Sequence, residues 1–224
     1  MDLGDSYMGK RVRYHGDGTF TVARIRDTTW LDKEFVRVPG RLRWFSKYDN
    51  GWADLKLEGE IANIVGKGPS LDKLKKWNFP HGPIFGINEA IHTLEGLELK
   101  KLYCVQQDTR LKGKCQPKYA TMLSSNMAAV HYRKYDKLYV YNPAELNLNY
   151  QTPTVICIIT MLLKAGFTDF QLWGFDAAVN QDCMYAKSLG YHPGAGGLDP
   201  GRFILHKKAI EDLLDPYTFK FNMP

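Results

Sequence analysis

The sequence predicts an α/β protein with a Rossmann-like, mostly parallel sheet, helices on both faces, and a small β-rich extension at its N-terminus. Short apolar runs alternate with helix-length segments from residue 59 onward, a pattern typical of parallel strands joined by helical crossovers. The first run, at 61–65, leads directly into a glycine-containing turn. Residues 1–58 instead hold short alternating segments around turn residues. We therefore divide the chain into an extension at 1–58 and a Rossmann-like domain at 59–224, whose candidate ligand is considered below.

The extension is expected to form hairpins. Segments 11–14 and 19–23 alternate polar and apolar residues on either side of a His-Gly-Asp-Gly turn at 15–18, a strong hairpin signal. Segments 34–38 and 41–45 flank Pro39-Gly40 in the same way.

The main domain is expected to alternate strands and helices. Helix 153–165 has proline in its first turn and Gly166 after its end, which are ordinary start and stop signals. Strands are expected at 61–65, 83–87, 101–105, 138–141 and 170–173, and further helices at 71–77, 89–94 and 202–214.

Composition narrows the class of protein. Hydrophobic content of 44% and charged content of 24% are ordinary globular values. The net charge of +6 favours anionic ligands such as nucleotides, glycans or nucleic acid, although a solvated basic surface explains it equally well. The longest apolar run, at 155–163, is too short for a membrane span. With an acidic N-terminus and four cysteines lacking a CxxC motif, the sequence predicts a cytoplasmic protein. Self-association into a homo-oligomer is left open.

The turn at 66–70, Gly-Lys-Gly-Pro-Ser, is a candidate phosphate loop. Glycines allow close approach of a ligand to the backbone, and Ser70 is placed to cap the following helix. Free N–H groups at a helix start favour negative charge, and Lys67 adds a positive one. The spacing is neither that of a Walker loop nor GxGxxG, because Leu71 stands at the third glycine position. On spacing alone, a purely structural turn is the favoured interpretation.

Three segments in fixed order make the pattern more specific. They are Ile-Val-Gly-Lys-Gly-Pro-Ser-Leu at 64–71, Phe-Gly-Ile-Asn at 85–88, and Thr-Pro-Thr-Val at 152–155 with a helix and strand that end in Leu-Trp-Gly-Phe-Asp at 172–176. This arrangement resembles bacterial sialyltransferases and the related superfamily that includes archaeal-type 6-hydroxymethylpterin pyrophosphokinases. The resemblance covers roughly residues 60–214.

The resemblance implies a metal-independent site for a nucleotide or nucleotide-sugar donor of the CMP or UDP type. Where the family often has Asn, this chain has Lys67, which suits a more highly charged phosphate. The donor-binding residues implied are Gly66, Lys67, Gly68, Pro69, Ser70, Asn88, Thr152 and Thr154.

A histidine is the implied base, since an imidazole titrates near neutral pH. His192, in a glycine-rich loop after the 170–173 strand, and His206, in the last helix, are the candidates. Asp176 either orients a histidine or a ribose, or caps the turn after its strand.

We therefore expect a glycosyltransferase-like protein whose acceptor is a glycan or, given the basic stretch at 100–137, a nucleic acid. The alternatives are a Mg²⁺-dependent pyrophosphokinase-like phosphoryl transferase and a non-catalytic protein that binds or sequesters a nucleotide.

Overall fold

The computed structural model describes residues 10–14, 20–24, 37–38, 51–79, 81–108, 115–132, 135–149, 151–176, 185–190 and 200–224. The chain divides into two compact units, Met1–Asp49 and Asn50–Pro224. Each is described by itself below.

The first unit contains a three-stranded antiparallel sheet in the order β1-β2-β3. Strands β1 (Lys10–Tyr14) and β2 (Phe20–Arg24) form a hairpin in which Tyr14 pairs with Phe20, as the turn at 15–18 predicts. The third strand, β3 (Arg37–Val38), pairs with β2. The strand expected at 41–45 lies outside the described residues.

The second unit begins earlier than the sequence suggested. A 3₁₀ helix, η1 (Trp52–Asp54), follows Gly51, which forms an isolated parallel bridge with Val140. Trp52, Leu55 and Leu57 pack against the main hydrophobic core. Residues 50–58, which we assigned to the extension, therefore belong to the second unit.

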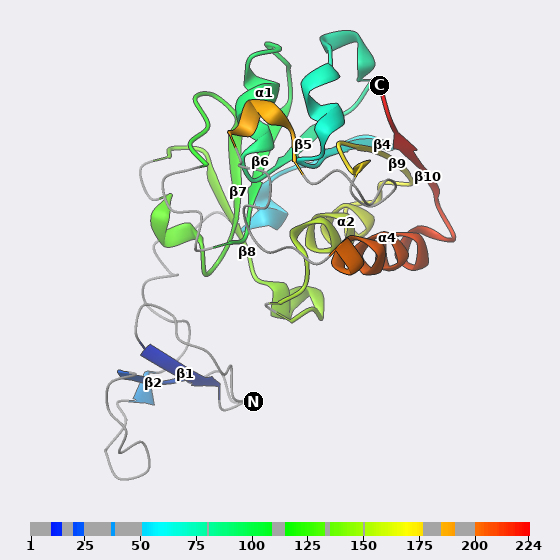
Figure 1. Ribbon diagram of the computed structural model, residues 1–224. Helices are drawn as coiled ribbons and strands as arrows, with labels where there is room; N and C mark the ends of the chain where they lie inside the picture. Colours follow the sequence, from blue (N-terminus) through cyan, green and yellow to red (C-terminus); the bar gives the residue numbers. More distant parts are fainter. Residues whose placement is uncertain are drawn as a thin grey trace. The chain divides into compact units, whose positions relative to one another are not determined.

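The second unit is built on a seven-stranded sheet in which every pairing is parallel, in the order β10-β9-β4-β5-β6-β7-β8 (Figure 1). The Rossmann-like α/β fold is therefore confirmed. Sequence patterning missed two strands: β7, which ends in two serines, and β10, at the sheet edge. The strands are β4 (Ile61–Val65), β5 (Ile84–Ile87), β6 (Leu102–Gln106), β7 (Thr121–Ser125), β8 (Leu138–Tyr141), β9 (Asp169–Trp173) and β10 (Thr218–Asn222).

The strand order places a topological switch point between β4 and β9. Successive strands from β4 to β8 step across the sheet in one direction, and the chain then returns to the other side of β4 to form β9 and β10. The connections after β4 and β9 therefore diverge. In open α/β sheets this is where ligands bind, beyond the carboxyl ends of the strands.

Helices lie on both faces of the sheet, with α1 on one face and α2 and α4 on the other (Figure 1). The helix expected at 71–77 is instead two 3₁₀ turns, because Leu74 and Lys75 between them are extended. The helices are α1 (Ala90–Glu95), α2 (Thr154–Lys164) and α4 (Pro200–Leu214), with 3₁₀ helices η2 (Pro69–Lys73), η3 (Lys76–Asn78), η5 (Ala129–His131), η6 (Pro143–Leu146) and η7 (Lys187–Leu189).

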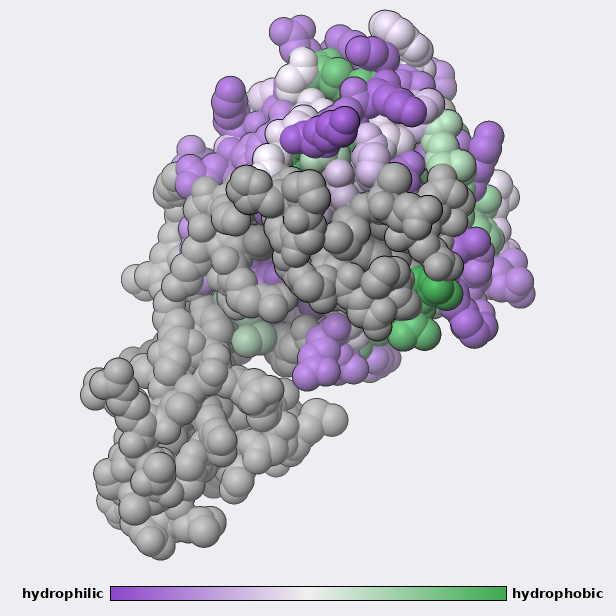
Figure 2. Space-filling view, viewed as in Figure 1, coloured by the Kyte–Doolittle hydropathy of each residue, from purple (hydrophilic) through white to green (hydrophobic). Residues whose placement is uncertain are grey.

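The core lies where α2 packs on the sheet. Val155 to Ile159, Met161 and Leu162 are all buried in the cluster that also contains Ile64, Phe85 and Leu172, so α2 is apolar around most of its circumference. No helix in the described part of the chain is long and apolar enough to cross a membrane. Figure 2 shows hydrophilic side chains over much of the described surface on the face in view.

A buried carboxylate joins α1 to the segment that leads into β7, one of the two strands that sequence patterning missed. Glu95, 7% exposed, accepts hydrogen bonds from the backbone N–H groups of Lys118, Tyr119 and Ala120 at 2.8–3.0 Å. These residues lead directly into β7. Glu95 therefore fixes the approach to that strand.

Replacing this carboxylate should destabilise the domain. We expect Glu95→Ala to lower the free energy of unfolding by about 3 kcal/mol, because it leaves three backbone donors without their charged acceptor. The exposed Glu58 provides the control, and Glu58→Ala should change stability by less than about 0.5 kcal/mol. Urea unfolding measures both. Equal midpoints for the two variants would contradict the role assigned to Glu95.

Candidate functional site

The loop after β4 and the loop after β9 are hydrogen-bonded to each other at the switch point. The Gly66 N–H donates to the carbonyl of Trp173, and the Gly68 N–H donates to the carbonyl of Gly174, each at 2.7 Å. The pairing of β4 with β9 thus continues beyond the end of both strands. These two loops therefore fill the base of the crevice in which we expected a ligand.

This close approach explains both glycines of the loop. A Cβ on Gly66 would lie 2.6 Å from the Gly174 carbonyl oxygen, and one on Gly68 would lie 2.4 Å from Oδ2 of Asp176. Gly174 adopts a positive φ of 66°, which also favours glycine. The neighbouring backbone alone is sufficient to require glycine at these positions.

Asp176 holds the next turn of the loop through a hydrogen bond. Its Oδ2 accepts the Ser70 N–H at 2.8 Å, and both residues are buried. Gly68, not Ser70, is the N-cap of η2, so the expected capping role of Ser70 is wrong. The Ser70 hydroxyl is buried without a hydrogen-bond partner among the described residues. The amides of Gly66, Gly68 and Ser70, which we expected to face a ligand, instead donate within the protein.

The positive charge of Lys67 is already compensated. Its Nζ lies 3.0 Å from Oε2 of Glu89 and 4.7 Å from the ring centroid of Tyr185. The side chains of Lys67 and Glu89 are only 14% and 7% exposed, so the pair is largely withdrawn from water. Sequence reasoning missed Glu89, although it directly follows Asn88.

Asn88 is held in an unusual backbone conformation at the end of β5. Its φ of 54° lies in the left-handed region, which asparagine tolerates better than most residues. Its N–H donates to the Val105 carbonyl at 2.9 Å, and its own carbonyl accepts from the Cys115 thiol at 3.3 Å. The side-chain Oδ1 is buried without a partner among the described residues. The side-chain oxygen of Asn88 is therefore available to accept a hydrogen bond.

A covering segment, residues 185–190, lies across the loop and η2. The Ala186 N–H donates to the Lys67 carbonyl at 2.8 Å. Asp72 accepts from the N–H groups of Lys187 and Ser188 at 2.8 and 3.3 Å, so it caps the start of η7. Nothing in the sequence spacing pointed to this contact between segments more than a hundred residues apart.

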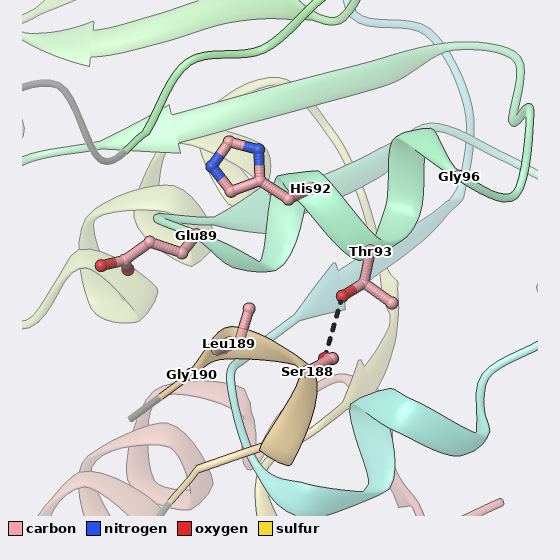
Figure 3. Close-up of a pocket in the computed structure, with 7 residues that line it drawn as sticks. All are labelled: Glu89, His92, Thr93, Gly96, Ser188, Leu189 and Gly190. Carbon is pink, nitrogen blue, oxygen red and sulfur yellow. Dashed lines mark hydrogen bonds between the residues drawn. The ribbon is translucent and has the colours of Figure 1, made fainter. Parts of the chain in front are cut away.

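An open pocket of about 590 Å³ lies between the covering segment and α1 (Figure 3). Thr93 on α1 points toward Ser188 on η7, and their hydroxyl oxygens are 3.5 Å apart. Pockets of this size accommodate small organic ligands. Its lining residues are Glu89, His92, Thr93, Gly96, Ser188, Leu189 and Gly190.

A second cluster of polar residues lies around Gln107, at the ends of β6, β7 and β8. The Gln107 Nε2 donates to the Thr152 carbonyl at 2.8 Å, and its Oε1 accepts from the Tyr141 hydroxyl at 3.3 Å. Burial raises the pKa of Tyr141, so its hydroxyl stays protonated and can donate. The Ser125 hydroxyl donates to the Gln107 carbonyl at 3.4 Å. Gln107 thus joins three strand ends to the start of α2.

The expected site residues therefore fall into two groups, both beyond the carboxyl ends of the parallel strands. The 66–70 loop, including Pro69 at the first position of η2, meets Asp176 directly, and Lys67 reaches the segment that carries Asn88. Thr152 lies with Gln107, and Thr154 is the first residue of α2. His206 lies in α4, and His192 lies outside the described residues.

The tight fit at Gly68 makes a direct prediction. We expect Gly68→Ala to lower stability by about 2–3 kcal/mol, because its Cβ would overlap the Asp176 carboxylate and the Gly174 carbonyl. At Gly51 the nearest atom to a new Cβ is 3.6 Å away, so Gly51→Ala should be close to neutral. Thermal unfolding of the two variants compares them. A stable Gly68→Ala would show that the two loops are not held together as described.

The ion pair of Lys67 gives a second prediction. Lys67→Met should destabilise the ligand-free protein by about 2–3 kcal/mol, because it removes the ammonium that pairs with the buried Glu89 carboxylate. Lys67→Met combined with Glu89→Gln should recover a large part of this loss. A double-mutant cycle in urea measures the coupling. If Lys67→Met is neutral alone, the pair contributes nothing to stability.

Comparison with known proteins adds no further constraint on the site. The chain matches no protein-family model, and no curated protein matches its sequence at a significant level. The geometry of the site therefore carries the functional argument.

Proposed function

We propose that this chain binds a nucleotide or nucleotide-sugar at the carboxyl edge of its parallel sheet and acts as a metal-independent glycosyltransferase. One observation carries the proposal. Residues from four separate segments, around 66–70, 88, 152–154 and 176, lie at that one edge, with the first and last of them at the switch point. In open α/β sheets, nucleotide ligands favour this location.

The unsatisfied side-chain atoms support a ligand near Asn88. Its Oδ1 and the Ser70 hydroxyl both lack partners among the described residues, whereas buried polar atoms normally have them. The pocket between α1 and η7 borders Glu89, the residue next to Asn88. We propose that the base or ribose of the nucleotide supplies the missing hydrogen bonds and that the pocket receives the remainder of the donor.

In the proposed reaction the acceptor hydroxyl attacks the anomeric carbon of the sugar as the bond to the nucleotide phosphate breaks. A base takes the hydroxyl proton, and His192 or His206 remains our candidate. Asp176 acts as a positioning residue, since its carboxylate already accepts the Ser70 N–H. The acceptor is a glycan or a nucleic acid.

A second candidate, a non-catalytic nucleotide-binding protein, is favoured by a specific observation. The loop amides of Gly66, Gly68 and Ser70 and the ammonium of Lys67 all have partners within the protein. Fewer groups are therefore left to stabilise a departing phosphate, which is usually a large part of catalysis. Such a protein would bind nucleotide tightly without turnover.

Thermal unfolding with a ligand panel tests the proposal. The panel contains CMP, UMP, UDP, CMP-sialic acid, UDP-sugars, and ATP with and without Mg²⁺. A ligand at 100 times its dissociation constant adds about 2.7 kcal/mol, which corresponds to a rise in melting temperature of roughly 5–10 °C. We expect a metal-independent rise with one nucleotide or its sugar conjugate.

Two asparagines with positive φ provide the variant and its control. Asn88→Gly removes the unpartnered Oδ1 but keeps a residue that adopts a φ of 54°, and it should abolish the ligand-induced rise. Asn147→Gly makes the same change at the exposed C-cap of η6, where φ is 61°, and should keep the rise.

The outcomes separate the candidate functions. Release of free nucleotide from a sugar conjugate in the presence of an acceptor supports the transferase, and tight binding without release supports the non-catalytic protein. A rise that requires both ATP and Mg²⁺ would replace the proposal with the pyrophosphokinase alternative. No rise with any ligand would leave the 66–70 loop as a structural turn and refute nucleotide binding.

A further inference from the structure

Two buried thiols face each other beside the candidate site. Cys104 lies on β6, and Cys115 begins the described segment that leads to β7. Their sulfur atoms are 3.1 Å apart, both residues are completely buried, and both are free thiols. We propose that Cys104 and Cys115 are a redox site that forms a reversible disulfide and thereby alters the candidate nucleotide site at Asn88.

Buried cysteines commonly pack as small apolar side chains, and Cys157 on α2 is such a case. The pair at 104 and 115 differs because the scaffold fixes both partners. Cys104 is held in a central strand of the sheet. Cys115 lies three residues before the backbone N–H groups of Lys118 to Ala120 that Glu95 binds. Bond formation requires the two sulfurs to close by about 1 Å.

The surroundings of Cys104 disfavour its thiolate form. Burial is the largest cause that raises the pKa of the Cys104 thiol, and the neighbouring Cys115 is the next. The carboxylates of Glu95 and Glu89 act in the same direction. Tyr132 and Tyr135 also interact electrostatically with the two cysteines, and burial raises their pKa values. The Cys104 thiolate is therefore scarce, and we expect oxidation to proceed through local opening of the structure.

Hydrogen peroxide supplies a balanced route to the disulfide. One thiolate sulfur attacks a peroxide oxygen, giving a sulfenic acid and hydroxide. The second thiol then attacks that sulfur and displaces water. Two thiol hydrogens and one peroxide thus leave as two water molecules, and a dithiol such as dithiothreitol reverses the change by exchange.

Oxidation would also change the contact with Asn88. The Cys115 thiol donates to the Asn88 carbonyl at 3.3 Å, and a disulfide sulfur has no hydrogen to donate. Asn88 would lose one of the contacts that hold its left-handed backbone, where φ is 54°. We expect a less well-ordered Asn88 side chain and weaker nucleotide binding in the oxidised protein.

Peptide mapping tests the disulfide directly. The full-length folded chain is treated with hydrogen peroxide, alkylated in denaturant and digested with trypsin, which places the two cysteines in peptides 102–110 and 115–118. We expect a linked pair of these peptides, absent after dithiothreitol. Cys115→Ser should abolish the link and Cys157→Ser should keep it. The idea fails if the folded wild-type chain gives no such link, or if Cys104 pairs equally with Cys157 or Cys183.

A second measurement tests the coupling, which rests on the proposed function. Oxidised and reduced wild-type protein are titrated with the panel nucleotide that gives the largest thermal shift. We expect at least about threefold weaker binding after oxidation, and no change in Cys115→Ser treated with peroxide. Equal affinities would overturn the coupling while the peptide map still decides the disulfide. Absence of binding in both states would refute the proposed function instead.

Discussion

The candidate site depends on the hydrogen bonds that join the loops after β4 and β9. A parallel sheet ordinarily opens at its switch point, because the two connections leave in opposite directions. Here the carbonyls of Trp173 and Gly174 accept the Gly66 and Gly68 amides, and Asp176 accepts the Ser70 amide. Each of these bonds satisfies a buried backbone donor that would otherwise be costly. They fix the shape of the loop before any ligand arrives.

That preorganisation determines which groups remain for a ligand. With the loop amides engaged and Lys67 paired to Glu89, two of the expected site residues keep a buried polar atom that has no partner in the described part of the chain: Asn88 at Oδ1 and Ser70 at its hydroxyl. These are neutral hydrogen-bonding groups. They suit recognition of a base or a sugar better than the neutralisation of a highly charged phosphate. Under the proposed function, the site would select its ligand by hydrogen bonds more than attract it by charge.

The sequence predicted the architecture well because apolar runs report burial on both faces of a parallel strand. It identified strands at β4, β5, β6, β8 and β9 and helices at α1, α2 and α4. It missed β7, which ends in Ser124 and Ser125, and β10, a short edge strand in which polar residues alternate with two phenylalanines. A search for apolar runs does not reveal a strand whose polar side chains form hydrogen bonds with residues that are distant in sequence.

The same limit applies to the site. The 66–70 loop and Asp176 could be identified because local motifs carry them. The partners Glu89 and Asp72 could not, because each acts through a contact made only by the folded chain. The glycines show the reverse problem. Their pattern suggested space for an external phosphate, but the space is taken by the Gly174 carbonyl and the Asp176 carboxylate.

The bridge between Gly51 and Val140 has a consequence for the solubility of the second unit. β8 is the last strand of the sheet, and an uncovered edge strand can recruit strands from other molecules. The bridge, with Trp52, Leu55 and Leu57 packed on the core, covers part of that edge. Residues 51–58 should therefore protect this edge from edge-to-edge aggregation. Cutting the chain at residue 59 would remove this protection and expose both the β8 edge and the apolar surface beneath these three side chains.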